Sequence, residues 1–197
     1  MYSDLHGHSR KSNVFAYGCN NKNKPEETRL FPMILSKLNP IFNFSYCRFN
    51  VQKYKEATAR VAVFKELKNC PNIFTIESTF SGIDYGEHQG QHITTQLLED
   101  LGKDLCRTIL VYEGIFVPDK IKDLYPNKDS TATEDYKDII MNELREDKKL
   151  LKAGEGDSSG GSDSEPSEDN MPIEEIAKVV PIVEKSAIKK LEKVLNK

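Results

Sequence analysis

A pair of histidines close to the start of the chain constrains its structure more than any other feature. His6 and His8 stand on either side of Gly7, just after Asp4. If the backbone is extended there, both imidazoles project from the same face of a strand. Neutral imidazole is a common zinc ligand, and Asp4 is near enough to orient one ring from behind. The pattern predicts a strand over residues 2–5, a turn at Gly7 and a metal ligand beside it, although a solvated terminal loop would carry the same residues.

A second constraint is a charged residue inside a run of strand-forming residues. Residues 73–80 alternate between two faces, and Glu77 lies on the more polar face with Thr75 and Thr79. Ionised carboxylates are rarely left inside a sheet unless they are paired or coordinated. The run therefore predicts a strand that presents Glu77 to a cleft. A paired structural charge is the alternative that the pattern leaves open.

Several stretches of the chain, taken in order, carry a resemblance to a known family. They are residues 4–11 with Asn13-Val14-Phe15 and Tyr17-Gly18-Cys19, then residues 42–49, residues 55–61, the strand around Glu77 and residues 92–106. In this order they resemble segments of the cytosolic carboxypeptidases, a branch of the zinc carboxypeptidases. The resemblance covers residues 2–117, and several separate motifs in the right order make it specific.

The resemblance implies a metallocarboxypeptidase that hydrolyses C-terminal residues, with Zn2+ as its cofactor. His6 matches the family's third zinc ligand, and Glu77 matches its general base, which deprotonates zinc-bound water. Asp4 and His8 would support that ligand from behind. The implied substrates are acidic protein C-terminal tails that lose glutamates, with tubulin as the expected example. The implied fold is α/β, the C-terminal half of a mixed sheet with flanking helices.

Arg60 is the candidate for contact with the substrate. It lies where the family has a basic residue that is thought to meet the acidic side chain of the substrate. A planar guanidinium suits a carboxylate because it can donate two parallel hydrogen bonds. An ordinary surface ion pair with Glu56, four residues earlier, is an equally good interpretation.

One expected motif is missing from this sequence. In the family, the first two zinc ligands come from a His-x-x-Glu motif, and none of the 4 histidines here has a glutamate three residues later. We therefore expect the chain to be the C-terminal part of a catalytic domain. Two other classes stay open: a catalytically inactive module that cannot hold zinc, and a partner-binding protein that acts through a terminal helix.

Periodicity predicts the remaining elements. Apolar residues at helical spacing predict helices over residues 26–38, 53–68, 95–112 and 133–151. The third of these is the clearest and is expected to pack on the sheet, whereas the fourth has a narrow apolar stripe and is expected to dock weakly. Residues 41–49 are predicted to be extended, and residues 10–26 and 115–130 to be loops.

Composition bounds the class of protein and its organisation. Charged residues make up 30% of the chain and the net charge is −3, which gives no case for a nucleic-acid surface. No apolar run or signal region suggests a membrane, and the cysteines lack CxxC spacing, so we expect a cytoplasmic protein with reduced thiols. The expected parts are a partial catalytic domain, a loop with a polar helix, a disordered acidic linker, and a basic amphipathic helix that could bind a helical partner. They span residues 1–117, 118–152, 153–171 and 172–197.

Overall fold

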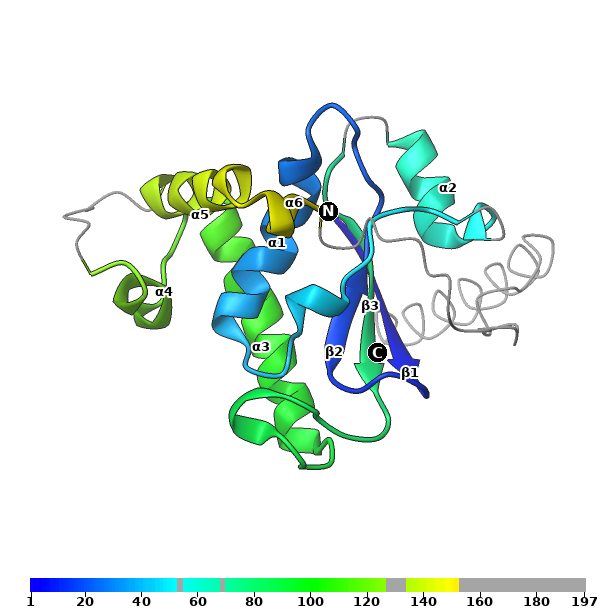
Figure 1. Ribbon diagram of the computed structural model, residues 1–197, viewed down its shortest axis with the longest axis vertical. Helices are drawn as coiled ribbons and strands as arrows, with labels where there is room; N and C mark the ends of the chain where they lie inside the picture. Colours follow the sequence, from blue (N-terminus) through cyan, green and yellow to red (C-terminus); the bar gives the residue numbers. More distant parts are fainter. Residues whose placement is uncertain (53–54, 68–69, 127–133, 153–197) are drawn as a thin grey trace, which may run out of the picture.

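The structure is a computed structural model that describes residues 1–52, 55–67, 70–126 and 134–152. Its sheet contains β1 (Tyr2–His8), β2 (Val14–Tyr17) and β3 (Ile73–Thr79) in the order β1-β3-β2. β1 runs parallel to β3, and β2 runs antiparallel to it (Figure 1). The expected α/β class with a mixed sheet is therefore present. The predicted acidic linker and terminal helix lie outside the described residues.

Helices flank this small sheet. Figure 1 shows α1, α3 and α5 gathered to one side of the strands and α2 to the other. The longer helices are α1 (Pro25–Leu38), α2 (Ala59–Glu66), α3 (Thr95–Tyr112) and α5 (Glu134–Glu146). The shorter ones are η1 (Phe44–Tyr46), η3 (Gly86–His88), α4 (Asp119–Asp123) and α6 (Lys148–Lys152). None of the helices in the described part of the chain is long and apolar enough to cross a bilayer.

The core lies between α1 and the sheet. α1 begins with proline and two glutamates, a sequence that suits a helix N-terminus, and it ends before Pro40. Phe31 on this helix stacks on Phe74 of β3 with ring centroids 5.6 Å apart, and both side chains are almost fully buried. This packing fixes which face of the sheet is covered and leaves the opposite face for the site.

The helix α3 has the predicted bounds. It starts where expected because the Thr94 hydroxyl accepts a hydrogen bond from the Leu97 N–H. Its backbone lies against α1 and α5, and its buried Leu101 and Val111 belong to the same core cluster as Phe74 and Ile76 of β3. A buried hydrogen bond of 3.1 Å from Asn39 to Asp104 ties α3 to the end of α1.

Several local expectations near the strands are also wrong. β1 does not turn at Gly7 but continues to His8, and Gly7 pairs with Ser78. A Cβ at Gly7 would collide with the ring of Phe80, so the glycine serves close packing instead. Residues 14–17 form a strand rather than a loop. Residues 41–49 contain a 3-10 turn and only isolated bridges to β2, because their aromatic side chains fill the core.

Three expectations about the helices and the loop after α3 need correction as well. The helix expected over residues 53–68 is described only over Ala59–Glu66, and it buries Arg60 and Val61. The helix α5 was expected to dock weakly. It instead packs against α1 and buries three side chains: Tyr136, Ile140 and Leu144. Residues 115–130, expected to be a loop, include the short helix α4. The apolar stripe of α5 is narrow, but it meets a complementary surface that the sequence pattern does not reveal.

Candidate functional site

The strand register gathers the predicted residues on one face of the sheet. Glu77 of β3 is paired with His6 of β1 on one side and with Phe15 of β2 on the other. Paired residues on neighbouring strands point to the same face, so these three side chains form one row across the sheet. The adjacent row contains Asp4, Thr75 and Tyr17.

Asp4 and His6 contact each other directly. The Nε2 atom of His6 lies 2.9 Å from Oδ1 of Asp4, and both side chains are about one-third exposed. In a neutral imidazole, an N–H donated to this carboxylate fixes the tautomer and places the ring lone pair on Nδ1. Asp4 is therefore placed where it can orient the His6 ring, while its supporting role and the metal-binding role of His6 stay predictions.

Glu77 is buried beside His8. Its residue exposure is only 6%, and its Oε2 atom lies 3.8 Å from Nδ1 of His8. The His8 ring packs edge-on against Phe15, with centroids 5.2 Å apart. His8, predicted to support a metal ligand, is thus placed against the predicted general base. At 3.8 Å the two groups are within ion-pair distance but beyond hydrogen-bond distance, so His8 adds a titratable group beside the Glu77 carboxylate.

A ring of cations surrounds Tyr17 next to this row. The ammonium groups of Lys11 and Lys55 lie 5.7 Å and 6.0 Å from the centroid of the Tyr17 ring, and the guanidinium carbon of Arg60 lies 5.5 Å from it. These distances are within cation–π range. Two segments far apart in sequence, one with Lys11 and one with Lys55 and Arg60, therefore concentrate positive charge next to the row that contains Glu77.

Arg60 is a buried residue rather than a surface one. It is 6% exposed, and no ion pair joins it to Glu56 within the described residues. Burial raises the pKa of the Cys19 thiol, and the charge and hydrogen bond of Arg60 partly offset that rise. The surface ion pair considered from the sequence is therefore absent here. The guanidinium is instead a buried member of the cationic ring, with Tyr17 and Cys19 as neighbours.

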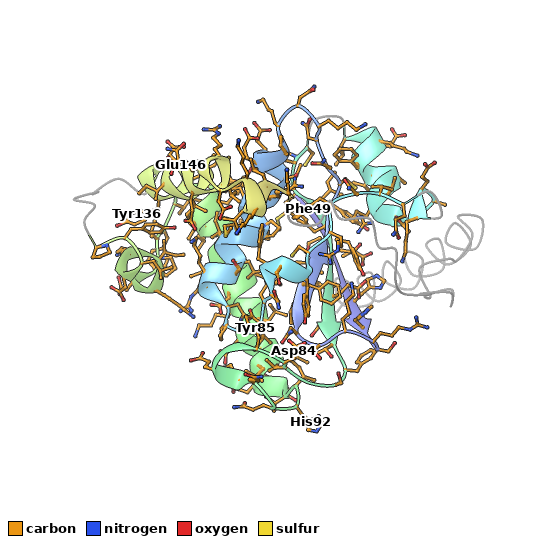
Figure 2. All side chains as sticks on the ribbon, viewed as in Figure 1. Phe49, Asp84, Tyr85, His92, Tyr136 and Glu146 are labelled. Carbon is orange, nitrogen blue, oxygen red and sulfur yellow. The ribbon has the colours of Figure 1, made fainter. Side chains whose placement is uncertain are left out.

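A clamp between Asn13 and Asp84 closes the end of the site, and sequence reasoning missed it. Asn13 has a positive φ of 66° and is fully buried. Its amide donates to the Asp84 carboxylate, and its carbonyl oxygen accepts the Asp84 N–H at 3.1 Å. Tyr46 donates to the other Asp84 oxygen at 2.8 Å, which raises the Tyr46 pKa. Figure 2 shows Asp84 near the loop end of the strands. The sequence signal that could have located this turn is an asparagine between a polar run and an apolar run, because asparagine tolerates positive φ.

The donor set fits one zinc ligand, not a complete zinc site. Among the residues that the structure describes, no three histidine, cysteine, aspartate or glutamate side chains lie close enough to hold a metal ion. A catalytic zinc generally has three protein ligands. His88 and His92 do not complete the set, because they contact Gln91 and the Ser81 carbonyl in a separate loop. Figure 2 shows His92 in that loop. His6, in contact with Asp4, stays the predicted ligand.

Comparison with known proteins identifies the relatives of the chain. No family model matches it. Cytosolic carboxypeptidase 3 of Mus musculus is 45% identical over 119 residues, which is 57% of this chain and 12% of the relative. Cytosolic carboxypeptidase 2 of Xenopus tropicalis is 46% identical over 116 residues, with the same two coverages. Cytosolic carboxypeptidase 2 of Mus musculus is 37% identical over 158 residues, or 79% of this chain and 17% of the relative.

These relatives confirm the resemblance that the motifs predicted. The chain is similar to a part of the cytosolic carboxypeptidases, and it spans between 12% and 17% of the length of the three relatives named above. The similarity concerns a short part of much longer proteins. The activity, substrates and partners of such a whole protein are therefore matters for proposal.

Proposed function

We propose that this chain carries the third zinc ligand and the general base of a metallocarboxypeptidase centre. The single observation that supports this most is the pairing of His6 with Glu77 across β1 and β3, in a chain similar to cytosolic carboxypeptidases. A ligand and a base must lie side by side to act on the same water, and the register places the two predicted residues in this relation.

Glu77 has the position of a proton carrier. Its carboxylate takes a proton from the attacking water and delivers it to the leaving nitrogen, while His8 and Phe15 limit its orientation. His6 is a zinc ligand in this proposal, and the metal, when bound, supplies electrophilic activation of the scissile carbonyl. The other ligands come from outside this sequence, because it contains no His-x-x-Glu motif.

The cationic ring around Tyr17 supports an acidic substrate. Lys11, Lys55 and Arg60 supply three positive charges beside the row that contains Glu77. Such a surface attracts anionic ligands and disfavours basic ones. We therefore propose acidic protein C-terminal tails as substrates, with glutamate as the residue removed and tubulin as an example. The relatives are named cytosolic carboxypeptidases, which supports a cytoplasmic location.

A chimera tests this proposal. Residues 2–117 of this chain replace the matching segment of Cytosolic carboxypeptidase 3 from Mus musculus, and release of glutamate from a peptide ending in glutamates is measured. The chimera should be active. Glu77→Gln should lower kcat by about 10²-fold or more, because it removes the proton acceptor and keeps the shape of the side chain.

Glu87→Gln is the matched control, because Glu87 is an exposed carboxylate outside the row. It should leave kcat within about twofold, since surface substitutions away from special features have small effects. An active Glu77→Gln chimera would contradict the assignment of the base. A folded but inactive chimera with intact Glu77 would contradict the proposal that this segment builds a working centre.

A further inference from the structure

The ring of Tyr17 is uncharged, yet three cations meet at it. Tyr17 is half-buried and lies in the row of the sheet next to the one that contains Glu77. The charged groups of Lys11, Lys55 and Arg60 lie 5.7 Å, 6.0 Å and 5.5 Å from its centroid. An aromatic ring attracts cations at these distances through the negative face of its π system. Tyr17 is therefore the common neighbour of all three charges.

The three cations would not stay together without an attractive neighbour. Lys11 follows β1 and Lys55 precedes α2, and both side chains are half-buried. Each ammonium group stands at the end of a flexible four-carbon stem, so it can adopt many positions. Like charges that are gathered at one ring also repel one another. The attraction of the ring opposes that repulsion and favours the gathered arrangement.

Tyr17 itself is held in place from several sides. Its backbone is paired with Thr75 of β3 and forms a bridge to Arg48 on the other side. Its ring meets the ring of Phe15 edge-on, with centroids 5.5 Å apart and planes 86° apart. Phe15 is fully buried and pairs with Glu77. The Tyr17 ring is thus a preformed platform that does not have to be ordered when a ligand binds.

A ladder of rings connects this platform to the predicted general base. The His8 ring packs edge-on against Phe15, and Phe15 packs edge-on against Tyr17. The Glu77 carboxylate lies 3.8 Å from His8 at the other end of the ladder. Neighbouring side chains on one face of a strand are about 7 Å apart, and one or two extended peptide residues span that distance. A single peptide can therefore reach both Glu77 and the cations.

We propose that Tyr17 is a positioning residue whose ring holds Lys11, Lys55 and Arg60 together as one anion-binding site beside Glu77. The ligand is a peptide rich in carboxylates, and this choice of ligand rests on the function proposed above. Tyr17 acts through the three cations. Removing its ring releases the lysines, and each side chain that must be ordered again on binding lowers the affinity roughly twofold to tenfold.

The contact between the lysines and the ring can be measured by NMR of the full chain with ¹³C-methylated lysines, because methylation keeps the charge. Lys11→Arg and Lys55→Arg assign the two signals. Groups over an aromatic ring resonate upfield, so both signals should be shifted upfield. Tyr17→Phe should keep the shift of Lys55, and Tyr17→Leu should abolish it. Lys55 is the cleaner reporter, because Lys11 also lies over Phe15, at 5.1 Å.

Tyr112→Leu is the matched control. The Tyr112 ring also holds a cation, since the ammonium group of Lys137 lies 4.2 Å from its centroid. Tyr112 packs against Phe31, on the side of the sheet that α1 covers. The control variant should therefore move the Lys137 signal and leave the Lys55 signal unchanged.

The second measurement is the affinity of the full chain for a dye-labelled peptide ending in glutamates, followed by fluorescence anisotropy. The Kd should rise about tenfold in Tyr17→Leu, because two lysines lose their ordered positions. It should stay within about twofold in Tyr17→Phe, which keeps a ring that attracts cations, and in Tyr112→Leu. A peptide with glutamines in place of the glutamates should bind more weakly and should not distinguish the variants.

Four results would overturn the proposal. An unchanged Lys55 signal in Tyr17→Leu would show that the ring does not hold this lysine. An unchanged Kd in the same variant would show that the platform does not serve binding. A Tyr17→Phe variant as weak as Tyr17→Leu would assign the effect to the hydroxyl group. No measurable binding of the acidic peptide to the unaltered chain would remove the anion site itself.

Neither measurement needs zinc or turnover. An inactive chimera would therefore count against the proposed catalytic centre, whereas the lysine signals and the peptide affinities decide the role of Tyr17.

Discussion

Asn13 allows a quantitative test of how the end of the site is held. It is fully buried, has a φ of 66°, and exchanges two side-chain hydrogen bonds with Asp84. Its backbone also joins two loops, because its N–H donates to Gly82 at 3.0 Å and its carbonyl accepts from Thr79 at 3.1 Å. Asn13→Ala and Asn13→Gly both remove the side-chain bonds, but only alanine is strained at this φ.

The two substitutions should therefore differ in a defined direction. Asp84 is exposed to water, so each of the two lost hydrogen bonds costs about 0.5–1.5 kcal/mol, or about 1–3 kcal/mol together, in either variant. Alanine in the left-handed region costs about 1–2 kcal/mol more. We expect Asn13→Ala to lower the free energy of unfolding by about 2–5 kcal/mol. We expect Asn13→Gly to be the less damaging of the two, although glycine is normally the more destabilising residue inside regular structure.

Urea denaturation followed by circular dichroism measures both free energies of unfolding. Asp84→Asn serves as a comparison, because it keeps the shape of the partner while removing its charge. A loss below about 0.5 kcal/mol for Asn13→Ala would place it with ordinary surface substitutions. That result, or an alanine variant more stable than the glycine variant, would refute the clamp.

Three further predictions concern the core, the helical layer and alkaline pH. Phe31→Ala removes a ring stacked on Phe74 and should lower the free energy of unfolding by about 3–5 kcal/mol in the same assay. Leu144→Ala, at a fully buried position of α5, should cost about 2–5 kcal/mol, whereas a loss near zero would mean that this helix docks weakly after all. Burial raises the pKa of the Cys47 thiol and of the Tyr85 hydroxyl to about 12 in each case. The folded state favours the protonated forms of both groups. The free energy of unfolding should therefore be unaffected below their ordinary pKa values of 9.0 and 10.0 and should fall as pH rises towards 12. A urea midpoint that is constant from pH 8 to 11.5 would contradict this.

Long elements with strong periodicity were predictable from the sequence, and short ones were not. The helix α3 and the strand β3 have patterns long enough to define their type, and the Thr94 cap marks the start of α3. By contrast, β2 is only four residues long, and its strand conformation depends on pairing with β3. The sequence pattern of α3 also could not show that its backbone would lie against α1 and α5.

The site shows the same division between local pattern and tertiary arrangement. The alternation of side chains along a strand predicted that His6 and His8 share one face and that Glu77 lies on the more polar face of its strand. Both predictions depend on the residues alone. The distance between these segments depends on strand order and register, which bring His6 opposite Glu77 across many intervening residues. The cationic ring around Tyr17 requires the segment with Lys11 to converge with the segment that carries Lys55 and Arg60, which no local pattern in the sequence shows.

Zinc stoichiometry of the chimera tests the central claim most directly. After dialysis against trace zinc, the chimera should hold one equivalent of zinc, His6→Ala should lose it, and Glu77→Gln should keep it, because a base is not a ligand. The chain on its own should bind no stoichiometric zinc, since no three metal-binding side chains come together among its described residues. A His6→Ala chimera that retains its zinc, or an isolated chain that holds one equivalent, would contradict the account.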